Sequence, residues 1–380
     1  MSQPKSFYKD ANITPQAIFG LLVLLMGGVS IYLTDHYYSN LFPMTLEGGA
    51  LCDINTFWNC DHTANSPISN VFGVPISLFG LLFSCFLFLG FFIPKPEIEA
   101  TNHILLRYNL VGCIILFFYS VIALGGICPG CMAYYILSAL SAWMFFKNSN
   151  IKRVDGKVLG GYIIAGLCVS GLAMAHLEHK KANNDKLASA LIPQFDKLAD
   201  IGDPMPKSAY YYIKATENFS DAPIRITKFS DYECPGCRLM AKALEKVAKR
   251  FEGSINIQYV FFPLDMNCNS TMKGPLHQNA CKASYLASCV GEKFPVVTDT
   301  FFDNQELINN IWLDNMAARY GAVDCMNGED AKNKVLEHIE VGKKFEISGT
   351  PTLIINGKKI TRMLPADQLY VLLEHLKNKK

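Results

Sequence analysis

The amino-acid sequence predicts a bundle of five membrane-spanning α-helices followed by a soluble α/β domain that carries a helical insertion. Three observations support this prediction. Apolar residues crowd into the first 176 of the 380 residues, the long apolar runs there contain no charged side chain, and Cys-Pro-Gly-Cys occurs twice, once inside such a run and once in the polar second half. The net charge of +2 gives no reason to expect a nucleic-acid partner.

Four uncharged runs define the membrane part, at residues 17–33, 71–93, 108–146 and 158–175. A membrane helix needs about 20 apolar residues, whereas the third run has 39. The stretch "GGICPGC" at its middle favours a tight turn, so we expect two spans there and five in total. The first run lacks a clear small-x-small cleavage site, so we interpret it as a retained helix and not as a signal peptide.

Basic residues predict the orientation of the spans, because cytoplasmic loops are enriched in Lys and Arg. Residues 35–73 contain neither, whereas the loop 147–157 contains Lys147, Lys152, Arg153 and Lys157. We therefore place the loop 147–157 in the cytoplasm. Residues 35–73, the turn at 128–131 and everything after about residue 177 then lie outside it.

The thirteen cysteines fit this orientation. Three close pairs, Cys52/Cys60, Cys128/Cys131 and Cys234/Cys237, all fall on the non-cytoplasmic side, where disulfides persist. Three others, Cys85, Cys113 and Cys168, lie inside spans, and we interpret them as inert buried thiols. The last four, Cys268, Cys281, Cys289 and Cys325, could form structural disulfides, whose pairing the sequence leaves open.

The chain divides into a membrane domain (1–177), a linker with a short helix (178–207) and a soluble domain (208–380). In the soluble domain "IRITKFSDYE" predicts a strand, "RLMAKALEKVAKRF" a helix and "INIQYVFFPL" a second strand. Residues 275–345 are mostly helical in pattern. The stretch "GTPTLIINGKKI" predicts a hairpin with an Asn-Gly turn, and "PADQLYVLLEHLKN" predicts a closing helix.

The second Cys-Pro-Gly-Cys follows a strand and begins a helix. The partial positive charge of a helix N-terminus stabilises a thiolate, so we expect Cys234 to have a lowered pKa and to be the attacking sulfur. Cys237, one turn further on, would resolve the mixed disulfide. Pro351, after Thr350, is expected to be a cis-proline that places backbone beside Cys234 for substrate docking.

These features resemble the DsbA-like branch of the thioredoxin superfamily over residues 208–380. The residues that carry the resemblance are Cys234–Cys237, Thr350-Pro351 and the stretch that begins "FFPLDMN". The resemblance implies a dithiol that oxidises or isomerises the thiols of secreted proteins. A zinc knuckle is the alternative for Cys-Pro-x-Cys, but knuckles usually carry Gly after the second Cys, where this chain has Arg238 and Met132; we expect no metal.

Residues 14–177 resemble the vitamin K epoxide reductase family. The pattern consists of Leu51-Cys52-Asp53, Thr56 and Cys60, then "SNVFG", then Cys128–Cys131 with Tyr135 four residues later. The resemblance implies that Cys128/Cys131 reduce a quinone, with Cys131 nearest the ring, and that Cys52/Cys60 carry electrons from the soluble domain. It implies quinone contacts from Tyr135 and from either Ser69 or Asn70. From the residues alone, Tyr135 could instead be a core aromatic, and Ser69 and Asn70 could cap the next helix.

The sequence therefore predicts a quinone-dependent disulfide-forming oxidoreductase of a bacterial inner membrane. Its partners would be reduced periplasmic proteins, the lipid bilayer and a quinone, either ubiquinone or menaquinone. Two alternatives remain open: electrons that run outward to a periplasmic isomerase, or a non-catalytic membrane-anchored chaperone. The sequence also leaves open whether Cys52 or Cys60 meets the soluble domain, with family resemblance favouring Cys60 for contact with Cys128.

Overall fold

The computed structural model of the chain describes residues 6–47, 58–122, 124, 126–151, 154–272 and 276–379, without the side chains of Asp10, His62, Asp185 and Leu187. The chain forms two compact units. Unit 1 comprises residues 1–38 and 66–181, and unit 2 comprises residues 39–65 and 182–380. The described residues 39–47 and 58–65, which we expected within the first domain, belong to the second unit.

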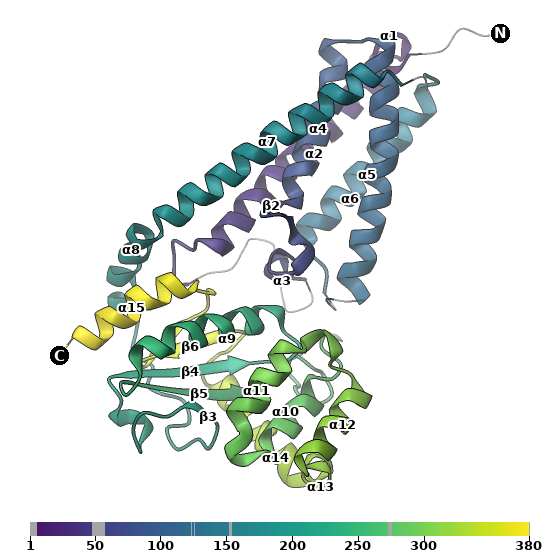
Figure 1. Cartoon of the computed structure of the whole chain (residues 1–380). Coiled ribbons are helices and arrows are strands. Elements are labelled where there is room, and N and C mark those ends of the chain that lie inside the picture. The colour runs from purple at the N-terminus through teal and green to yellow at the C-terminus, as the bar shows by residue number, and fades with distance from the viewer. Residues whose placement is uncertain are drawn as a thin grey trace. The chain divides into compact units, whose positions relative to one another are not determined.

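Unit 1 is a bundle of apolar helices (Figure 1). Its elements are α1 (Phe7–Asp10), α2 (Ile13–Leu41), η1 (Pro67–Ser69), β1 (Asn70–Val71), β2 (Val74–Pro75), α4 (Ile76–Phe92), α5 (Pro96–Ile122), α6 (Pro129–Asn148) and α7 (Gly156–Ala182). Within the described residues, α2, α5, α6 and α7 are long and apolar enough to cross a membrane, and α4 is a shorter apolar helix of 17 residues. The prediction of a five-helix apolar bundle is thereby confirmed, and the expected break in the third run falls between α5 and α6.

Many large apolar side chains of this bundle point outward. Examples are Leu24, Ile115, Ile164 and Leu167, each more than half exposed. A soluble protein rarely exposes such a surface, whereas lipid tails cover it at no cost. The same reasoning corrects one expectation: Cys85 and Cys168 are exposed on the bundle and not buried within it, and only Cys113 is buried among protein atoms.

Polar groups inside the bundle satisfy one another. The buried carboxylate of Glu99 accepts hydrogen bonds from the Ser6 hydroxyl (2.6 Å), the Phe7 N–H (2.8 Å) and the Ser149 hydroxyl. Asn102 donates to the Tyr8 hydroxyl at 3.1 Å. Such pairing is required because an unpaired polar group in an apolar medium costs several kcal/mol. These bonds fix α1 against α5 at one end of the bundle.

Unit 2 is an α/β domain built on a five-stranded sheet. Its elements are α3 (Cys60–Ala64), α8 (Asn184–Lys197), β3 (Tyr211–Ile213), η2 (Phe219–Asp221), β4 (Ile224–Ser230), α9 (Pro235–Ala248), η3 (Lys249–Phe251), β5 (Ile255–Phe261), α10 (Ala280–Ser288), η4 (Gly291–Lys293), α11 (Phe294–Asp303), η5 (Gln305–Leu307), α12 (Asn310–Tyr320), α13 (Val323–Asn327), α14 (Glu329–Lys344), β6 (Thr352–Ile355), β7 (Lys358–Ile360) and α15 (Ala366–Asn378). The strand order is β3-β5-β4-β6-β7. Only β4 and β5 run parallel, because α9 returns the chain between them.

The sheet is covered by helices from distant parts of the chain (Figure 1). Helix α9 packs against α15 along one face, whereas α14 packs against β5 and α11 against β3. Two disulfides constrain the helical insertion α10–α14. Cys268–Cys281 joins α10 to the segment before it, and Cys289–Cys325 joins the C-cap of α10 to α13. The structure thus supplies the pairing that the sequence left open. The α/β prediction with a helical insertion is confirmed.

Candidate functional site

The soluble dithiol is positioned by the junction between β4 and α9. Strand β4 ends at Ser230, and Cys234 is the N-cap residue of α9, with Pro235 at the first helical position. Proline suits that position because it needs no hydrogen-bond partner for a backbone N–H. Cys234 and Cys237 are both buried, and both are free thiols.

The loop before β6 covers this dithiol. The Thr350–Pro351 bond is cis, as expected, and the Cys234 Sγ donates to the Thr350 carbonyl oxygen at 3.3 Å. A Cβ at Gly236 would lie 3.0 Å from the Pro351 Cδ. Glycine in the tetrapeptide therefore permits the proline ring to sit directly on the start of α9. The structure brings together four residues predicted from the sequence: Cys234, Cys237, Thr350 and Pro351.

The two thiols do not ionise alike. Burial raises the pKa of Cys237, but a hydrogen bond from Cys234 and the positive charge of Lys228 outweigh it and lower that pKa to about 7. Burial is the main reason that the pKa of Cys234 is raised. The direction of these shifts differs from the expectation of a lowered pKa at Cys234, and the role of Cys234 as the attacking sulfur stays a prediction. Its S–H donates to a carbonyl oxygen, whereas the Cys237 sulfur accepts from the Asp231 N–H at 3.4 Å.

A buried acidic cluster lies beside the dithiol. One carboxylate oxygen of Asp231 lies 2.9 Å from the His277 Nδ1 and accepts from the Leu264 N–H at 2.6 Å. Burial opposes protonation of His277, but the charge of Asp231 outweighs it and raises the pKa of His277. Burial also raises the pKa of Glu233, which directly precedes Cys234. This cluster, like Lys228, was missed by sequence reasoning.

Lys228 did leave a signal in the sequence. It alternates with Ile224 and Ile226 along the strand "IRITKFS", so it belongs to the same buried face of β4. A lysine on the apolar face of a central strand is rare unless its charge is paired or used. The contact between Asp231 and His277 left no comparable signal, because the two residues are 46 positions apart in the sequence.

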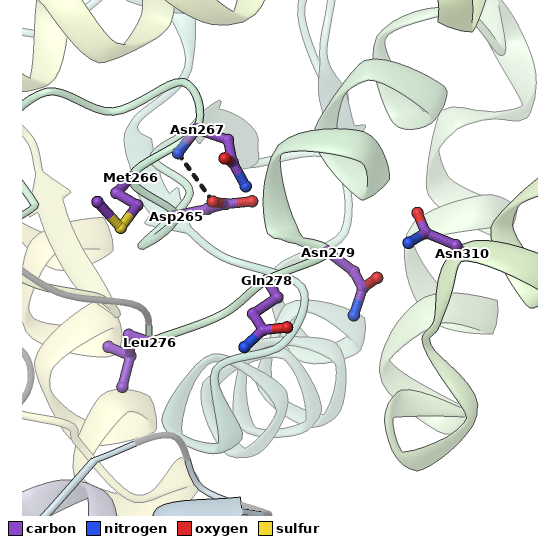
Figure 2. A pocket seen from close by; sticks show the side chains of 7 residues that line it. All are labelled: Asp265, Met266, Asn267, Leu276, Gln278, Asn279 and Asn310. Carbon is purple, nitrogen blue, oxygen red and sulfur yellow. Dashed lines mark hydrogen bonds between the residues drawn. The ribbon is translucent and has the colours of Figure 1, made fainter.

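Unit 2 has a polar pocket (Figure 2). It has a volume of about 270 Å³ and is lined by Asp265, Met266, Asn267, Leu276, Gln278, Asn279 and Asn310. Asn279 connects it to the active-site loop, since its backbone N–H and side-chain amide donate to the Glu233 carboxylate at 2.7 and 3.0 Å. Carboxamides and a carboxylate can bind the main-chain groups of an extended peptide.

The membrane dithiol repeats the helix-start geometry in unit 1. Cys128 is the N-cap of α6, and its Sγ accepts from the Cys131 N–H at 3.1 Å. Cys128 is buried, and Cys131 is partly exposed. A Cβ at Gly130 would lie 2.8 Å from a methyl group of Leu33, so glycine again permits close packing over the motif.

Tyr135 lies one helical turn after Cys131 on the same face of α6. It is partly exposed and packs against the buried group Met26, Cys113 and Tyr134. Next to it, Tyr134 donates to Asn109 at 3.0 Å, and Asn109 donates to Ser138. This buried polar set was also missed by sequence reasoning.

Ser69 and Asn70 lie in a tight turn before α4. The Asn70 Oδ1 accepts from the Gly73 N–H at 3.0 Å, and the Asn70 amide lies 3.4 Å from the Ser69 hydroxyl. Helix α4 begins at Ile76, after Pro75. The interpretation that Ser69 or Asn70 caps this helix is therefore wrong, and their roles toward a quinone stay predictions.

The loop pair lies only partly within the described residues. Cys52 lies outside them, whereas Cys60 begins α3 in unit 2 and is disulfide-bonded. The structure thus places Cys60 in the same compact unit as Cys234 and Cys237, and Cys128 and Cys131 in the other. Within the described residues, no group of three or more His, Cys, Asp or Glu side chains is arranged to hold a metal ion.

Comparisons with known families divide the chain in a similar way. The sequence model of the vitamin K epoxide reductase family matches residues 17–146, and a model described as thioredoxin matches residues 219–375. The first match includes Cys128 and Cys131, and the second includes Cys234 and Cys237.

Individual relatives cover only parts of the chain. The probable disulfide bond formation protein D of Bacillus cereus is 21% identical over 160 residues, which are 36% of this chain and 67% of that protein. The Na(+)/H(+) antiporter NhaA 1 of Mycolicibacterium gilvum is 26% identical over 150 residues, which are 37% of this chain and 22% of the antiporter. The chain therefore spans about a fifth of the antiporter's length.

Solved structures are similar to part of the chain. The catalytic domain of Proteus mirabilis ScsC has 20% identity and a TM-score of 0.35, covering 42% of this chain and 86% of that one. Oxidised BdbD of Bacillus subtilis has 19% identity and a TM-score of 0.34, covering 41% of this chain and 89% of that one.

Proposed function

We propose that this chain, which joins a domain of the vitamin K epoxide reductase family to a thioredoxin-family domain, is a membrane thiol–disulfide oxidoreductase that forms disulfides in secreted proteins. Electrons would pass from a client dithiol to Cys234/Cys237, then to Cys52/Cys60, then to Cys128/Cys131 and finally to a quinone. One observation carries the proposal: each unit holds a Cys-Pro-Gly-Cys pair at a helix N-terminus, and a disulfide-bonded cysteine, Cys60, lies before both pairs in sequence, at the start of α3.

The first transfer is thiol–disulfide exchange at Cys234/Cys237. A client thiolate attacks the Cys234 sulfur and breaks the Cys234–Cys237 bond, which leaves Cys237 as the departing thiolate. The lowered pKa of Cys237 makes it a good leaving group, because its charge is stabilised by Lys228 and by the Asp231 N–H. A second client thiolate then attacks the client sulfur of the mixed disulfide, so the client is oxidised and Cys234/Cys237 are reduced.

The next transfers repeat the same exchange with new partners. The reduced Cys234/Cys237 pair breaks the Cys52–Cys60 disulfide, and the resulting loop dithiol breaks a Cys128–Cys131 disulfide. Each exchange moves two electrons and breaks one S–S bond for each one formed. The location of Cys60 in unit 2 supports a loop that receives electrons from Cys234/Cys237.

The last acceptor in this proposal is a quinone, either ubiquinone or menaquinone. It takes two electrons and two protons, while the Cys128/Cys131 dithiol becomes a disulfide. The partly exposed Cys131 thiol and Tyr135, on the same face of α6, fit an apolar ring that approaches from the membrane. A tyrosine hydroxyl can donate to a quinone oxygen; Ser69 or Asn70 would supply a second contact.

The compartment follows from charge. The loop 147–157 carries Lys147, Lys152, Arg153 and Lys157, which favours its cytoplasmic location in a bacterial inner membrane. Unit 2 and all three cysteine pairs would then face the periplasm, where client proteins arrive reduced.

The experiment compares Cys131→Ala with Cys168→Ala, a control at an exposed free cysteine of α7. The purified chains receive excess reduced client protein and a soluble quinone analogue. We expect Cys131→Ala to abolish quinone reduction, measured by absorbance, while the chain still oxidises about two equivalents of client dithiol, one for Cys234/Cys237 and one for Cys52/Cys60. The control should keep both activities, and quinone turnover by Cys131→Ala at the control's rate would count against the proposal.

The direction of electron flow needs a separate measurement. The chain, with Cys234/Cys237 oxidised, is mixed with reduced quinone, and the redox state of that pair is followed by alkylation. Net reduction of Cys234/Cys237 to completion would favour the outward route to a reductase or isomerase, whereas a pair that stays oxidised favours the inward relay.

A further inference from the structure

Lys228 is a lysine without a water-accessible surface. It lies in the middle of β4, and its side chain is fully buried. The Nζ donates to the Cys237 carbonyl oxygen at 2.9 Å and to the Tyr259 hydroxyl at 3.3 Å. It also lies 4.6 Å from the centre of the Tyr259 ring and 4.5 Å from that of Phe302. The ammonium group is therefore held directly behind the second cysteine of the dithiol.

The surroundings of Lys228 provide no permanent counter-ion. Its oxygen partners are neutral, and among the described residues no carboxylate lies within ion-pair distance of the Nζ. The charged and titratable groups that face it are Cys234 and Cys237 on α9, Tyr259 on β5 and Asp299 on α11. Asp299 is engaged elsewhere, since it accepts from the Tyr212 hydroxyl at 2.7 Å.

A buried cation needs a partner charge, because an unpaired charge in a protein interior costs several kcal/mol. The thiolate of the reduced dithiol is the one group here that gains and loses a negative charge with the redox state. When the disulfide forms, that negative charge disappears, and a protonated lysine would be left unpaired.

We propose that Lys228 is the proton store of the Cys234/Cys237 couple: it is protonated when the pair is reduced and neutral when the pair is a disulfide. The dithiol site is then electrically neutral in both redox states. Lys228 does not touch the client. It acts through the sulfurs, by supplying a positive charge beside the thiolate of the reduced pair.

The reaction balances in atoms and electrons. A client dithiol brings two electrons and two protons, and its two sulfurs form a new S–S bond while the Cys234–Cys237 bond breaks. One proton ends on the Cys234 thiol and the other on the Lys228 amine, which leaves Cys237 as a thiolate beside an ammonium ion. Reoxidation by the next disulfide returns both protons.

The electrostatics of the reduced site are consistent with this role. Burial lowers the pKa of Lys228 to about 8, although the negative charge of Cys237 opposes the shift. Oxidation removes that opposing charge and leaves the burial effect, so the pKa falls further and the proton leaves at neutral pH.

The test measures how many protons the site takes up when Cys234/Cys237 are reduced, and whether a thiolate forms at the same time. It uses the full chain, purified in detergent, with Cys52, Cys60, Cys128 and Cys131 replaced by serine. The pair Cys234/Cys237 is equilibrated with reduced and oxidised glutathione between pH 7 and 8, and thiolate is followed by absorbance at 240 nm. Two glutathione thiols supply two protons. If the site takes up both, the equilibrium constant stays constant within about twofold, even though a thiolate is visible. If the site takes up only one proton, the other is released to solvent, and the equilibrium constant for reduction rises tenfold per pH unit.

Substitution provides the second readout. Lys228→Met, which keeps the volume and removes the charge, should shift the half-ionisation of the thiolate upward by at least one pH unit and favour the disulfide at least tenfold at pH 7.5. The matched control is Lys358→Met on β7, a lysine of the same sheet whose Nζ donates to the carbonyl oxygens of Phe195 and Asp196. The control should leave both readouts unchanged.

Two results would overturn the proposal. One is a tenfold rise of the glutathione equilibrium constant per pH unit in the chain with Lys228, and this measurement needs no substitution at Lys228 that could impair folding. The other is an unchanged thiolate titration in Lys228→Met. Neither measurement uses quinone, so the inference stands or falls separately from the electron relay proposed above.

Discussion

At the scale of single residues, the same tetrapeptide acquires different chemistry from its neighbours. In both copies the first cysteine is an N-cap and the glycine permits close packing, of Pro351 in one case and Leu33 in the other. Only the copy in unit 2 has a buried lysine behind it. Both pairs therefore share a helix N-terminus, which favours a thiolate, whereas the buried lysine distinguishes the pair in unit 2, where we propose that it balances the charge.

The pair Asp231 and His277 yields a prediction for stability. Because the pKa of His277 is raised in the folded state, its ion pair contributes fully below the unfolded pKa of about 6.5 and is lost as pH rises through the raised value. His277→Gln should lower the stability of unit 2 by about 3 kcal/mol near pH 6, since it leaves a buried carboxylate without its ionic partner. The difference from the unsubstituted chain should shrink above the raised pKa.

The measurement is urea unfolding of unit 2 in the full chain, followed by amide hydrogen exchange in β4 and β5. The dithiol should be oxidised, because Cys237 and Glu233 also face His277. His375→Gln is the matched control, since that histidine lies 3.4 Å from Asp196 at the surface. A stability difference for His277→Gln that grows from pH 6 to pH 9 would show that the pair does not act as an ion pair.

Residue types and spacing in the sequence could predict the dithiols, because Cys-x-x-Cys after a strand is a local pattern. Thr350-Pro351 was predicted from the proline that opens a strand, and the quinone role of Tyr135 came only from family resemblance. The distribution of charge between Cys234 and Cys237 could not be predicted, because it depends on the Thr350 carbonyl and on Lys228. Those groups meet the sulfurs only in the folded sheet.

At the scale of elements, the segment 40–46 is anchored to unit 2 by groups far away in sequence. The Leu46 carbonyl accepts from the Thr361 and Arg362 N–H groups, each at 3.3 Å, and the Leu46 side chain is buried in the main core. Gln368 of α15 donates to the Pro43 carbonyl at 3.2 Å. This segment leads into the loop that carries the Cys52/Cys60 pair, so its anchoring restricts where that loop can go.

A chain of polar contacts reaches Asp61, the residue after Cys60. Arg362 donates to the Asn40 Oδ1 at 2.9 Å, and the Asn40 amide donates to Asp61 at 2.8 Å, directly after Cys60. We predict that Arg362→Ala slows electron transfer from Cys234/Cys237 to the loop disulfide by about tenfold, because small misplacements of reacting groups are costly. Rapid mixing with a reduced client, followed by acid quench and alkylation, measures this step.

Oxidation of the first client equivalent should be unaffected in Arg362→Ala, since Arg362 touches neither sulfur of Cys234/Cys237. Arg250→Ala is the control, because this arginine of the same unit lies 4.7 Å from the Tyr370 ring on α15. Faster amide exchange in residues 40–46 should accompany the slower transfer. An unchanged transfer rate despite that faster exchange would show that the anchor has no role in the relay.

Elements that depend on local pattern were predictable. The Asn-Gly turn is an example: Asn356 and Gly357 both have positive φ, at 46° and 80°, as a two-residue hairpin turn requires. The anchoring of residues 40–46 was not predictable, because its hydrogen bonds join segments more than 300 residues apart. No periodicity or spacing records such a contact.

At the scale of the whole molecule, the cysteine pairs are divided between two compact units. The two units differ in the solvent that their surfaces require. Unit 1 exposes apolar side chains that need lipid, whereas unit 2 buries its apolar residues in one core and carries charge on its surface. An electron path through both units therefore requires every pair to face the same side of the membrane. Composition predicted an apolar and a polar part of the chain, but it did not predict that Cys60 belongs to unit 2. Only the distribution of Lys and Arg indicates which side of the membrane the pairs face.

The topology can be tested with two single cysteines in a chain whose native cysteines are replaced by serine. Glu252→Cys lies at an exposed position of unit 2, and Lys157→Cys lies at an exposed position at the start of α7. If the basic loop 147–157 is cytoplasmic, an impermeant maleimide added to intact cells should label Glu252→Cys nearly completely and Lys157→Cys only after lysis. The reverse pattern would place all three native pairs in the reducing compartment, where their disulfides would not persist. Labelling of both positions in intact cells would mean an even number of spans between them, which contradicts the single passage that α7 makes between residue 157 and unit 2.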